Sequence, residues 1–369
     1  MSGYQESTLQ IDLSALTHNH AYLKSKLNAD TKMLAVVKAA GYGSDAVIIA
    51  KHLAALKVDY LAVAYTSEGV ALRDAGIQLP ILVLHPQPTN FDELTQRCLE
   101  PNIYSFRMLE LFVSKAKSLG IENYPIHLKF NTGLNRLGFA PSEVTKLIDL
   151  LKDTLEIKVK SVFTHLAASE DTKERDFTKT QLERFNNILA QLLPTLDYKP
   201  IIHATNTSGI LNFPEAHYDM VRSGIGLYGY GNAPEYDAAL KPVASLFSVI
   251  SQKHEVKRGQ SVGYNRAFIA KNTMTIATIP LGHADGISRQ YGNGIGWVTI
   301  KGQKAPMVGN ICMDMLMVDV SHIDCKEGDS VLIFGPDQSA NQLAQNASSI
   351  SYELLTAVAS RIKRVVVRK

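Results

Sequence analysis

A lysine beside a predicted strand carries the first chemical signal in the sequence. Lys38 directly follows the apolar run at residues 33–37 and begins the segment KAAGYGSD. A lysine in a partly dry site has a lowered pKa, and it can form an imine with a carbonyl group or act as a base. Most lysines at strand ends are solvated charges, so the interpretation of Lys38 depends on what surrounds it.

A glycine-rich segment carries the second signal. VRSGIGLYG, at residues 221–229, contains the GxGxxG pattern at Gly224, Gly226 and Gly229. A dinucleotide-binding fold requires that pattern after a first strand, at the beginning of a helix, with an acidic residue about 20 positions later. None of this context is present. We therefore interpret the segment as a turn whose backbone amides bind a single phosphate group.

Further polar residues follow other predicted strands. They are Lys129 and Arg136 in KFNTGLNRLG, His165 in FTHLA, and Asn206 and Thr207 in HATNTS. One polar residue at a strand end means little. Five of them around one predicted strand edge indicate a ring of ligand contacts.

The elements that must position these residues are short apolar strands alternating with amphipathic helices. Helices are predicted at residues 45–56, 142–153 and 175–193. Strands are predicted at residues 33–37, 60–64, 81–84, 102–104, 126–130, 159–164, 201–204 and 220–222. Eight alternating units favour a (β/α)8 TIM-type barrel over an open sheet, and the catalytic residues of such barrels follow the strands at one mouth.

The pattern changes after about residue 238 into strand-like runs separated by Gly, Pro, Asn or Asp. These runs are at residues 243–251, 260–264, 273–279, 296–300, 316–320 and 330–334, and a helix at 349–362 and an apolar run at 365–367 follow. The predicted fold is therefore α/β, with a barrel at 13–238 that binds the cofactor named below and a mainly β C-terminal domain at 239–369. We expect residues 1–12 to add a strand to the β domain.

Composition excludes several classes of protein. The formal net charge is +3 over 369 residues, and the basic residues are scattered, so nucleic acid is not an expected partner. No segment has the length and apolar character of a signal peptide or a membrane span, which predicts a cytoplasmic protein without membrane contact. The three cysteines, Cys98, Cys312 and Cys325, show no CxxC spacing, so neither a disulfide framework nor a metal site is predicted.

Six segments, taken in order, resemble the successive motifs of alanine racemases of the fold-type III pyridoxal-phosphate class. They are VVKAAGYGSD, KFNTGLNRLG, VRSGIGLYG, SVGYNRAF, IPLGHADG and GNICMDMLMVDV, and they span nearly the whole chain. The resemblance implies an isomerase that uses pyridoxal 5'-phosphate to interconvert L-alanine and D-alanine, which supplies D-alanine for peptidoglycan. It also implies a homodimer with active sites shared across the interface.

The resemblance also implies two catalytic bases. Lys38 would hold the cofactor covalently and act on one face of the substrate, while Tyr264 of the partner subunit would act on the opposite face. A phenol is a poor base at neutral pH, so we expect nearby positive charge from His165 or Arg222 to lower its pKa. Arg222 matches the residue that donates to the pyridine nitrogen. Because a guanidinium only donates, that nitrogen would stay unprotonated.

Other matched residues would bind the cofactor or the substrate. Arg136 would touch the phenolic oxygen of the cofactor or the substrate carboxylate, with Lys129 beside it as a possible carbamylated lysine. Met313 and Asp314 would approach the substrate carboxylate from the partner subunit, and His283 stands where the family usually has an entrance tyrosine. The predicted cofactor-binding set is Lys38, Tyr42, Arg136, His165, Asn206, Thr207, Arg222, Gly224, Ile225 and Tyr352.

Alternative functions stay open at this point. The nearest is a serine racemase or a broad-specificity racemase of the same family, because the motifs do not report the side-chain pocket. A fold-type III decarboxylase would need a different substrate-recognition segment, and a metal-assisted D-threonine aldolase would need a histidine and cysteine pair near the C-terminus. A non-catalytic protein that binds pyridoxal phosphate would lack a β domain bearing a second base such as Tyr264.

Overall fold

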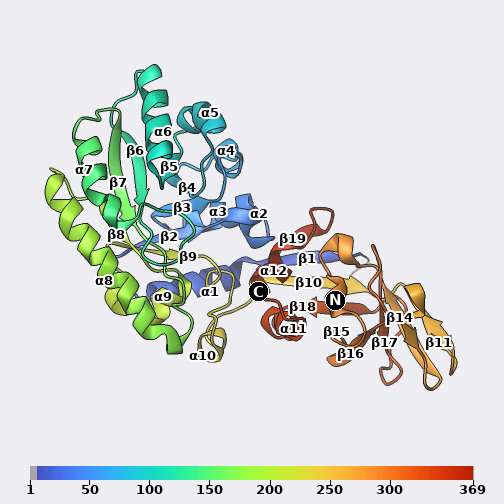
Figure 1. Cartoon of the computed structure of the whole chain (residues 1–369). Helices are drawn as coiled ribbons and strands as arrows, with labels where there is room; N and C mark the ends of the chain where they lie inside the picture. Colours follow the sequence, from blue (N-terminus) through green and yellow to red (C-terminus); the bar gives the residue numbers. More distant parts are fainter. Residues whose placement is uncertain (1–5, 369) are drawn as a thin grey trace.

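The computed structural model describes residues 6–368, which form a helix-covered barrel and an elongated, mainly β part beside it (Figure 1). Residues 1–5 of the predicted segment 1–12 lie outside the described residues. The β part extends away from the barrel, with β14 (Met274–Ile279) and β17 (Leu316–Asp319) towards its far end.

Eight parallel strands form the barrel sheet, as predicted. Two backbone hydrogen bonds, from Asp219 N to Ile202 O (3.0 Å) and from Arg222 N to Thr205 O (3.1 Å), join its two edges, so the barrel is nearly closed. Helices cover the outer face of such strands and side chains from the strands themselves fill the interior, which explains why most of these strands are apolar runs. In sheet order they are β8 (Ile201–His203), β7 (Ile157–Phe163), β6 (Tyr124–Lys129), β5 (Glu100–Ile103), β4 (Ile81–Val83), β3 (Tyr60–Val63), β2 (Lys32–Val36) and β9 (Met220–Ser223).

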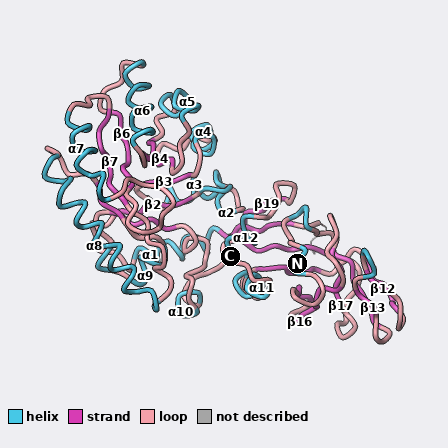
Figure 2. The backbone as a smooth tube through the Cα atoms, viewed as in Figure 1, coloured by secondary structure: helices cyan, strands magenta, loops and turns pink. Residues whose placement is uncertain are grey.

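Helices surround these strands (Figure 2). The predicted helices at 45–56, 142–153 and 175–193 are confirmed as α3 (Ala46–Ala55), α7 (Val144–Lys152) and α8 (Arg175–Leu192). Asp45 begins α3, since its Oδ1 accepts a hydrogen bond from Ile48 N at 2.9 Å. The other barrel helices are α1 (Leu13–Lys24), α2 (Lys38–Tyr42), α4 (Thr66–Asp74), α5 (Phe91–Gln96), α6 (Phe106–Ser118) and α9 (Thr207–Asn212).

The C-terminal part is built on a nine-stranded sheet in the order β11-β14-β17-β16-β15-β18-β10-β1-β19. Here β1 (Thr8–Asp12) pairs antiparallel with β10 (Ala244–Val249) and parallel with β19 (Lys363–Val367). A short ribbon of β12 (Ser261–Val262) and β13 (Phe268–Ile269) stands apart from this sheet. The remaining elements are β11 (Gln252–Val256), β15 (Trp297–Ile300), β16 (Gln303–Val308), β18 (Ser330–Phe334), α10 (Pro234–Asp237), α11 (Ala340–Asn346) and α12 (Ser351–Thr356).

Two local predictions in this part are wrong. The helix predicted at 349–362 ends at Thr356, because Asp285 O captures the amide of Ala359 and the chain then turns into β19. The strand predicted at 260–264 ends at Val262, because Gly263 adopts a φ of 76° and Tyr264 begins a short 3₁₀ turn. The strands β11 and β16 were not predicted, because their many exposed residues hide the alternation of apolar and polar residues that marks a strand.

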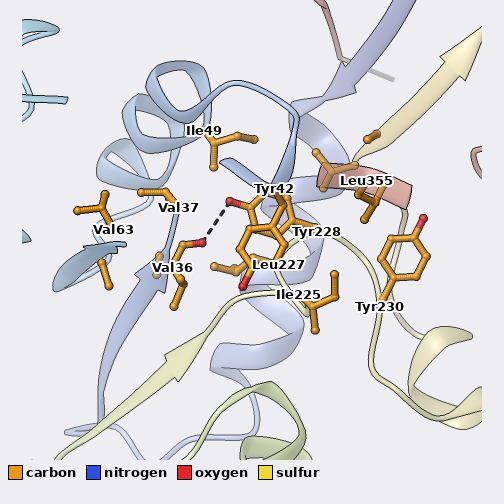
Figure 3. Packing of buried hydrophobic residues seen from close by; sticks show 14 of the residues in the cluster. Val36, Val37, Tyr42, Ile49, Val63, Ile225, Leu227, Tyr228, Tyr230 and Leu355 are labelled. Carbon is orange, nitrogen blue, oxygen red and sulfur yellow. Dashed lines mark hydrogen bonds between the residues drawn. The ribbon is translucent and has the colours of Figure 1, made fainter. Parts of the chain in front are cut away.

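The two parts meet behind the α2 turn. Arg364, on β19, donates hydrogen bonds to Gly43 O (2.9 Å) and Ser44 O (3.2 Å) of the barrel. Tyr42 stacks on Tyr228 with ring centroids 4.3 Å apart, and Leu355 of α12 lies close by (Figure 3). The residue that ends α2 is therefore held in place by contacts from both parts. No helix within residues 6–368 is long and apolar enough to cross a membrane.

Candidate active site

A cavity of about 670 Å³ lies at the carboxyl ends of the barrel strands, within the range of roughly 300–1,000 Å³ that small-molecule sites occupy. No Asp or Glu of the described chain lines it. Its cationic lining suits an anionic ligand such as a phosphate or a carboxylate. The cavity brings together eleven of the residues singled out in the sequence: Lys38, Tyr42, Lys129, Arg136, His165, Asn206, Thr207, Arg222, Gly224, Ile225 and Tyr352.

An unusual backbone conformation places Lys38. The residues after it, Ala39, Ala40 and Gly41, have φ values of 52°, 53° and 62°, so the chain makes a left-handed turn. Such a conformation costs an L-residue roughly 1–2 kcal/mol. The carboxylate of Glu68 supports the turn, since it accepts hydrogen bonds from Ala39 N at 2.6 Å and from Ala64 N at 2.7 Å.

The electrostatic surroundings favour a neutral Lys38. Burial lowers the pKa of its amine, and the positive charge of Arg136 lowers it further, while Glu68 opposes both. A neutral amine is the form that attacks a carbonyl group or accepts a proton. The surroundings of Lys38 therefore support the role that its place after a strand suggested, which is to form an imine or to act as a base.

The glycine turn offers two backbone donors. Within the described chain, the amide nitrogens of Gly224 and Ile225 donate to no backbone acceptor. A Cβ on Gly224 would lie 2.2 Å from Tyr42 Oη, so only glycine fits beside that hydroxyl. Thr207 Oγ1 accepts from Gly226 N at 3.1 Å and still lines the cavity. Amides and hydroxyls thus meet at one point, as a phosphate site requires.

Arg222 is buried beneath the cavity with a fixed orientation. Its Nη1 donates to His203 Nδ1 at 2.7 Å, and its Nη2 donates to Thr164 O at 2.8 Å and to Ala204 O at 2.9 Å. The described chain provides no acceptor for its Nε. That N–H therefore remains free to donate to a ligand atom in the cavity.

His165 lies against Arg222 in surroundings that disfavour its charged form. Burial lowers the pKa of His165 well below its ordinary value, and the charge of Arg222 adds to this effect. Of the two expected sources of positive charge near Tyr264, these surroundings disfavour His165 and favour Arg222. Because His165 Nδ1 lies 3.2 Å from Arg222 Nη2, which can only donate, the imidazole proton is on Nε2.

Lys129 and Arg136 form the cationic wall of the cavity. Burial lowers the pKa of Lys129 to about 8, with a further contribution from Arg136. Asn131 organises the loop that carries Arg136, because its Oδ1 accepts from Gly133 N at 3.2 Å and Asn135 N at 2.9 Å. An asparagine makes these contacts without adding a negative charge.

The remaining predicted residues lie on the β part. Tyr264, Met313 and Asp314 line an open hollow of about 610 Å³, and 72% of Tyr264 is exposed. His283 lies beside the hollow, since His283 N donates to Cys312 O at 3.0 Å. Within one chain, the second predicted base therefore lines a different hollow from Lys38.

Four further polar residues line the cavity and were missed by the sequence analysis: Tyr65, His85, Asn102 and Ser208. The His85 ring contacts Tyr65 edge-on at 5.8 Å. Tyr65 and His85 follow strands β3 and β4 within two residues. The strand-end rule that selected His165 would also have found them. No group of three His, Cys, Asp or Glu that could hold a metal ion occurs within residues 6–368.

These features fit pyridoxal phosphate. The cavity offers a half-buried amine with a lowered pKa, two amides without backbone acceptors beside hydroxyls, and a guanidinium N–H at its floor. An aldehyde, a phosphate and a pyridine nitrogen are the groups of that cofactor that these three features would bind.

Comparisons with known proteins agree with this site. Residues 11–232 match the family model "Alanine racemase, N-terminal domain", and residues 243–366 match "Alanine racemase, C-terminal domain". The chain is 36% identical to the alanine racemase of Desulfovibrio desulfuricans, over 97% of each chain. It is 30% identical to the alanine racemase of Bartonella henselae with covalently bound pyridoxal phosphate, with a TM-score of 0.90 over 99% of this chain and 100% of that one.

A further solved structure is the alanine racemase of Clostridium difficile 630 in complex with cycloserine. It is 33% identical to this chain, with a TM-score of 0.90 over 99% of this chain and 96% of that one. The two matched domains follow each other along almost the whole sequence. The chain therefore belongs to the alanine racemase family.

Proposed function

We propose that this protein is a pyridoxal-phosphate-dependent racemase that interconverts L-alanine and D-alanine. The observation that carries the proposal is the cavity in which Lys38, Arg222 and the Gly224 turn meet, in a chain of this family. Bound in that cavity, the cofactor would supply an electron sink for the α-carbon of the substrate.

Each residue has a defined task in this proposal. Lys38 holds the cofactor and exchanges a proton at Nζ on one face of the substrate. Arg222 donates from Nε to the ring nitrogen, and since a guanidinium gives up no proton there, the electron sink stays weak and side reactions are suppressed. Arg136 binds the anionic oxygen of the cofactor or the substrate carboxylate.

The second base would come from another copy of the chain. Tyr264 and Met313 are 72% and 60% exposed, although both are large and apolar. An exposed apolar surface of this kind marks an interaction site. Two copies related by a two-fold axis would place the hollow of each against the cavity of the other, which gives each site one lysine and one tyrosine.

Assay and labelling test the proposal. The purified protein loaded with pyridoxal phosphate should convert L-alanine to D-alanine, and borohydride reduction followed by peptide mapping should label Lys38. An absence of interconversion would reject the function, and a label on another lysine would reject the site. A panel of L-amino acids, with a His283→Tyr variant beside it, would show whether serine or larger substrates pass the entrance.

Two other expectations belong to this proposal. A pKa of about 8 leaves part of the Lys129 amine neutral, so it can add carbon dioxide, and the resulting carbamate would place a negative charge beside Arg136. Incubation with isotopically labelled bicarbonate and mass spectrometry of the native protein tests this modification.

A cytoplasmic location also stays a prediction, which cell fractionation would test.

A further inference from the structure

Arg222 is a buried charge without an adjacent carboxylate. It is 4% exposed, and its described hydrogen-bond partners are two imidazoles and two backbone carbonyls. Burying a guanidinium without an anionic partner is strongly unfavourable. Its charge must therefore be balanced by a group further away.

A chain of buried side chains connects Arg222 to such a group. His203 Nε2 lies 2.9 Å from Ser161 Oγ, and Ser161 Oγ lies 2.6 Å from His127 Nδ1. His127 Nε2 in turn lies 2.7 Å from Glu100 Oε2. His203, Ser161 and His127 are fully buried. The five residues belong to β9, β8, β7, β6 and β5, so the chain crosses the barrel interior from strand to strand.

With a neutral His127, the two ends of this chain fix the direction of every hydrogen bond in it. A guanidinium only donates, so His203 Nδ1 accepts from Arg222 and His203 Nε2 carries the proton given to Ser161 Oγ. The Ser161 hydroxyl then donates to His127 Nδ1, and His127 Nε2 donates to Glu100. A carboxylate only accepts, so the direction required at the far end is the same.

We propose that Glu100, His127, Ser161 and His203 form a directional hydrogen-bond relay that positions Arg222 and balances its charge. The proposal rests on the donor role assigned to Arg222 above. The relay holds Nη1, so that Nε, which has no acceptor in the described chain, stays free for a ligand, and it makes Glu100 the remote counter-ion of Arg222. These four are positioning residues, because none of them lines the cavity.

Aromatic rings pack against both imidazoles of the relay and limit their rotation. The Phe163 ring stacks on His203 with centroids 4.7 Å apart, and the Tyr60 ring meets His127 edge-on at 6.0 Å. Burial lowers the pKa of His203 well below its ordinary value, with Arg222 as the second cause. Neutral rings that cannot turn preserve one set of donors and acceptors.

Nitrogen NMR of the full-length protein tests the relay without any measurement of racemisation. With ¹⁵N-labelled histidine, His127 and His203 should both appear as neutral Nε2–H tautomers, before and after loading with pyridoxal phosphate. An Nδ1–H tautomer or an imidazolium at either residue would overturn the proposal. The proposed function could fail while this pattern is still found, so the two failures are distinguishable.

A variant tests whether the relay positions Arg222. Ser161→Ala removes the central hydroxyl, so His127 should lose its single tautomer and the Kd for pyridoxal phosphate should rise roughly tenfold, the effect of one lost buried hydrogen bond. Thr178→Val is the matched control, since it removes a buried hydroxyl that has no partner in the described chain. The control should change neither signal. An unchanged Kd in Ser161→Ala would overturn the positioning role.

Discussion

At the scale of single residues, the site depends on close fits that leave no room for a side-chain atom. Gly224 is the clearest case, because a Cβ there would lie 2.2 Å from Tyr42 Oη and 3.0 Å from Tyr42 Cζ. Tyr42 itself is fixed by its stack on Tyr228. The turn and the tyrosine therefore form one unit, although nearly the whole barrel separates them in the sequence.

A pair of substitutions tests this fit. Gly224→Ala should lower the free energy of unfolding by about 1–3 kcal/mol, the usual cost of overpacking. Adding Tyr42→Phe removes the hydroxyl oxygen that the new Cβ would overlap. The double variant should therefore recover part of the lost free energy of unfolding. Chemical unfolding of the cofactor-free protein measures both effects. A double variant as unstable as the sum of the two single variants would show that the clash is not with the hydroxyl.

At the scale of elements, Glu68 joins two strand ends to the lysine turn. It lies in the first turn of α4, and its carboxylate bridges the chain after β2 and the chain after β3, through Ala39 N and Ala64 N. Glu143 has a similar capping role at another helix, where it accepts from Ala140 N at 2.6 Å. Only Glu68 also acts on the pKa of Lys38, which it raises.

The pH dependence of Lys38 modification tests this role. In Glu68→Gln the carboxylate charge is lost, so the pKa of Lys38 should fall further below its ordinary value. The rate at which a small acylating reagent modifies Lys38 in the cofactor-free protein should then rise at a lower pH than in the wild type. Glu143→Gln should leave the rate profile unchanged, and an equal shift in both variants would refute the electrostatic role.

Some of these elements could be predicted from the sequence and others could not. The barrel strands were predictable because their residues are buried on both faces and form apolar runs. β16 was not, because the exposed residues Gln303, Lys304 and Pro306 give it a polar surface. Lys38 could be selected by its place after a strand. Glu100 could not, because its importance comes from a partner on the neighbouring strand.

At the scale of the whole molecule, a single chain holds the two predicted bases in separate places. Lys38 lines the barrel cavity, while Tyr264 lines the hollow on the β part. Met315 also lines that hollow and is 48% exposed. Under the proposed function, a complete two-base site would therefore need a second copy of the chain.

Association should depend on the hollow. Met315→Glu places a charge in a surface that the second copy would bury, so it should weaken the dimer by about 2 kcal/mol or more. Sedimentation measured over a range of concentrations would show the shift towards monomer. Leu155→Glu is the control, because Leu155 is an exposed apolar residue of the barrel. A shift in the control but not in Met315→Glu would place the interface elsewhere.

The central claim, a racemase site built from Lys38 of one chain and Tyr264 of another, is tested most directly by mixing two inactive variants. Lys38→Ala and Tyr264→Ala should each lack racemase activity. Each mixed dimer then holds one intact site, so random exchange of subunits should restore about a quarter of the wild-type rate. A mixture that contains mixed dimers but shows no activity would contradict the shared site.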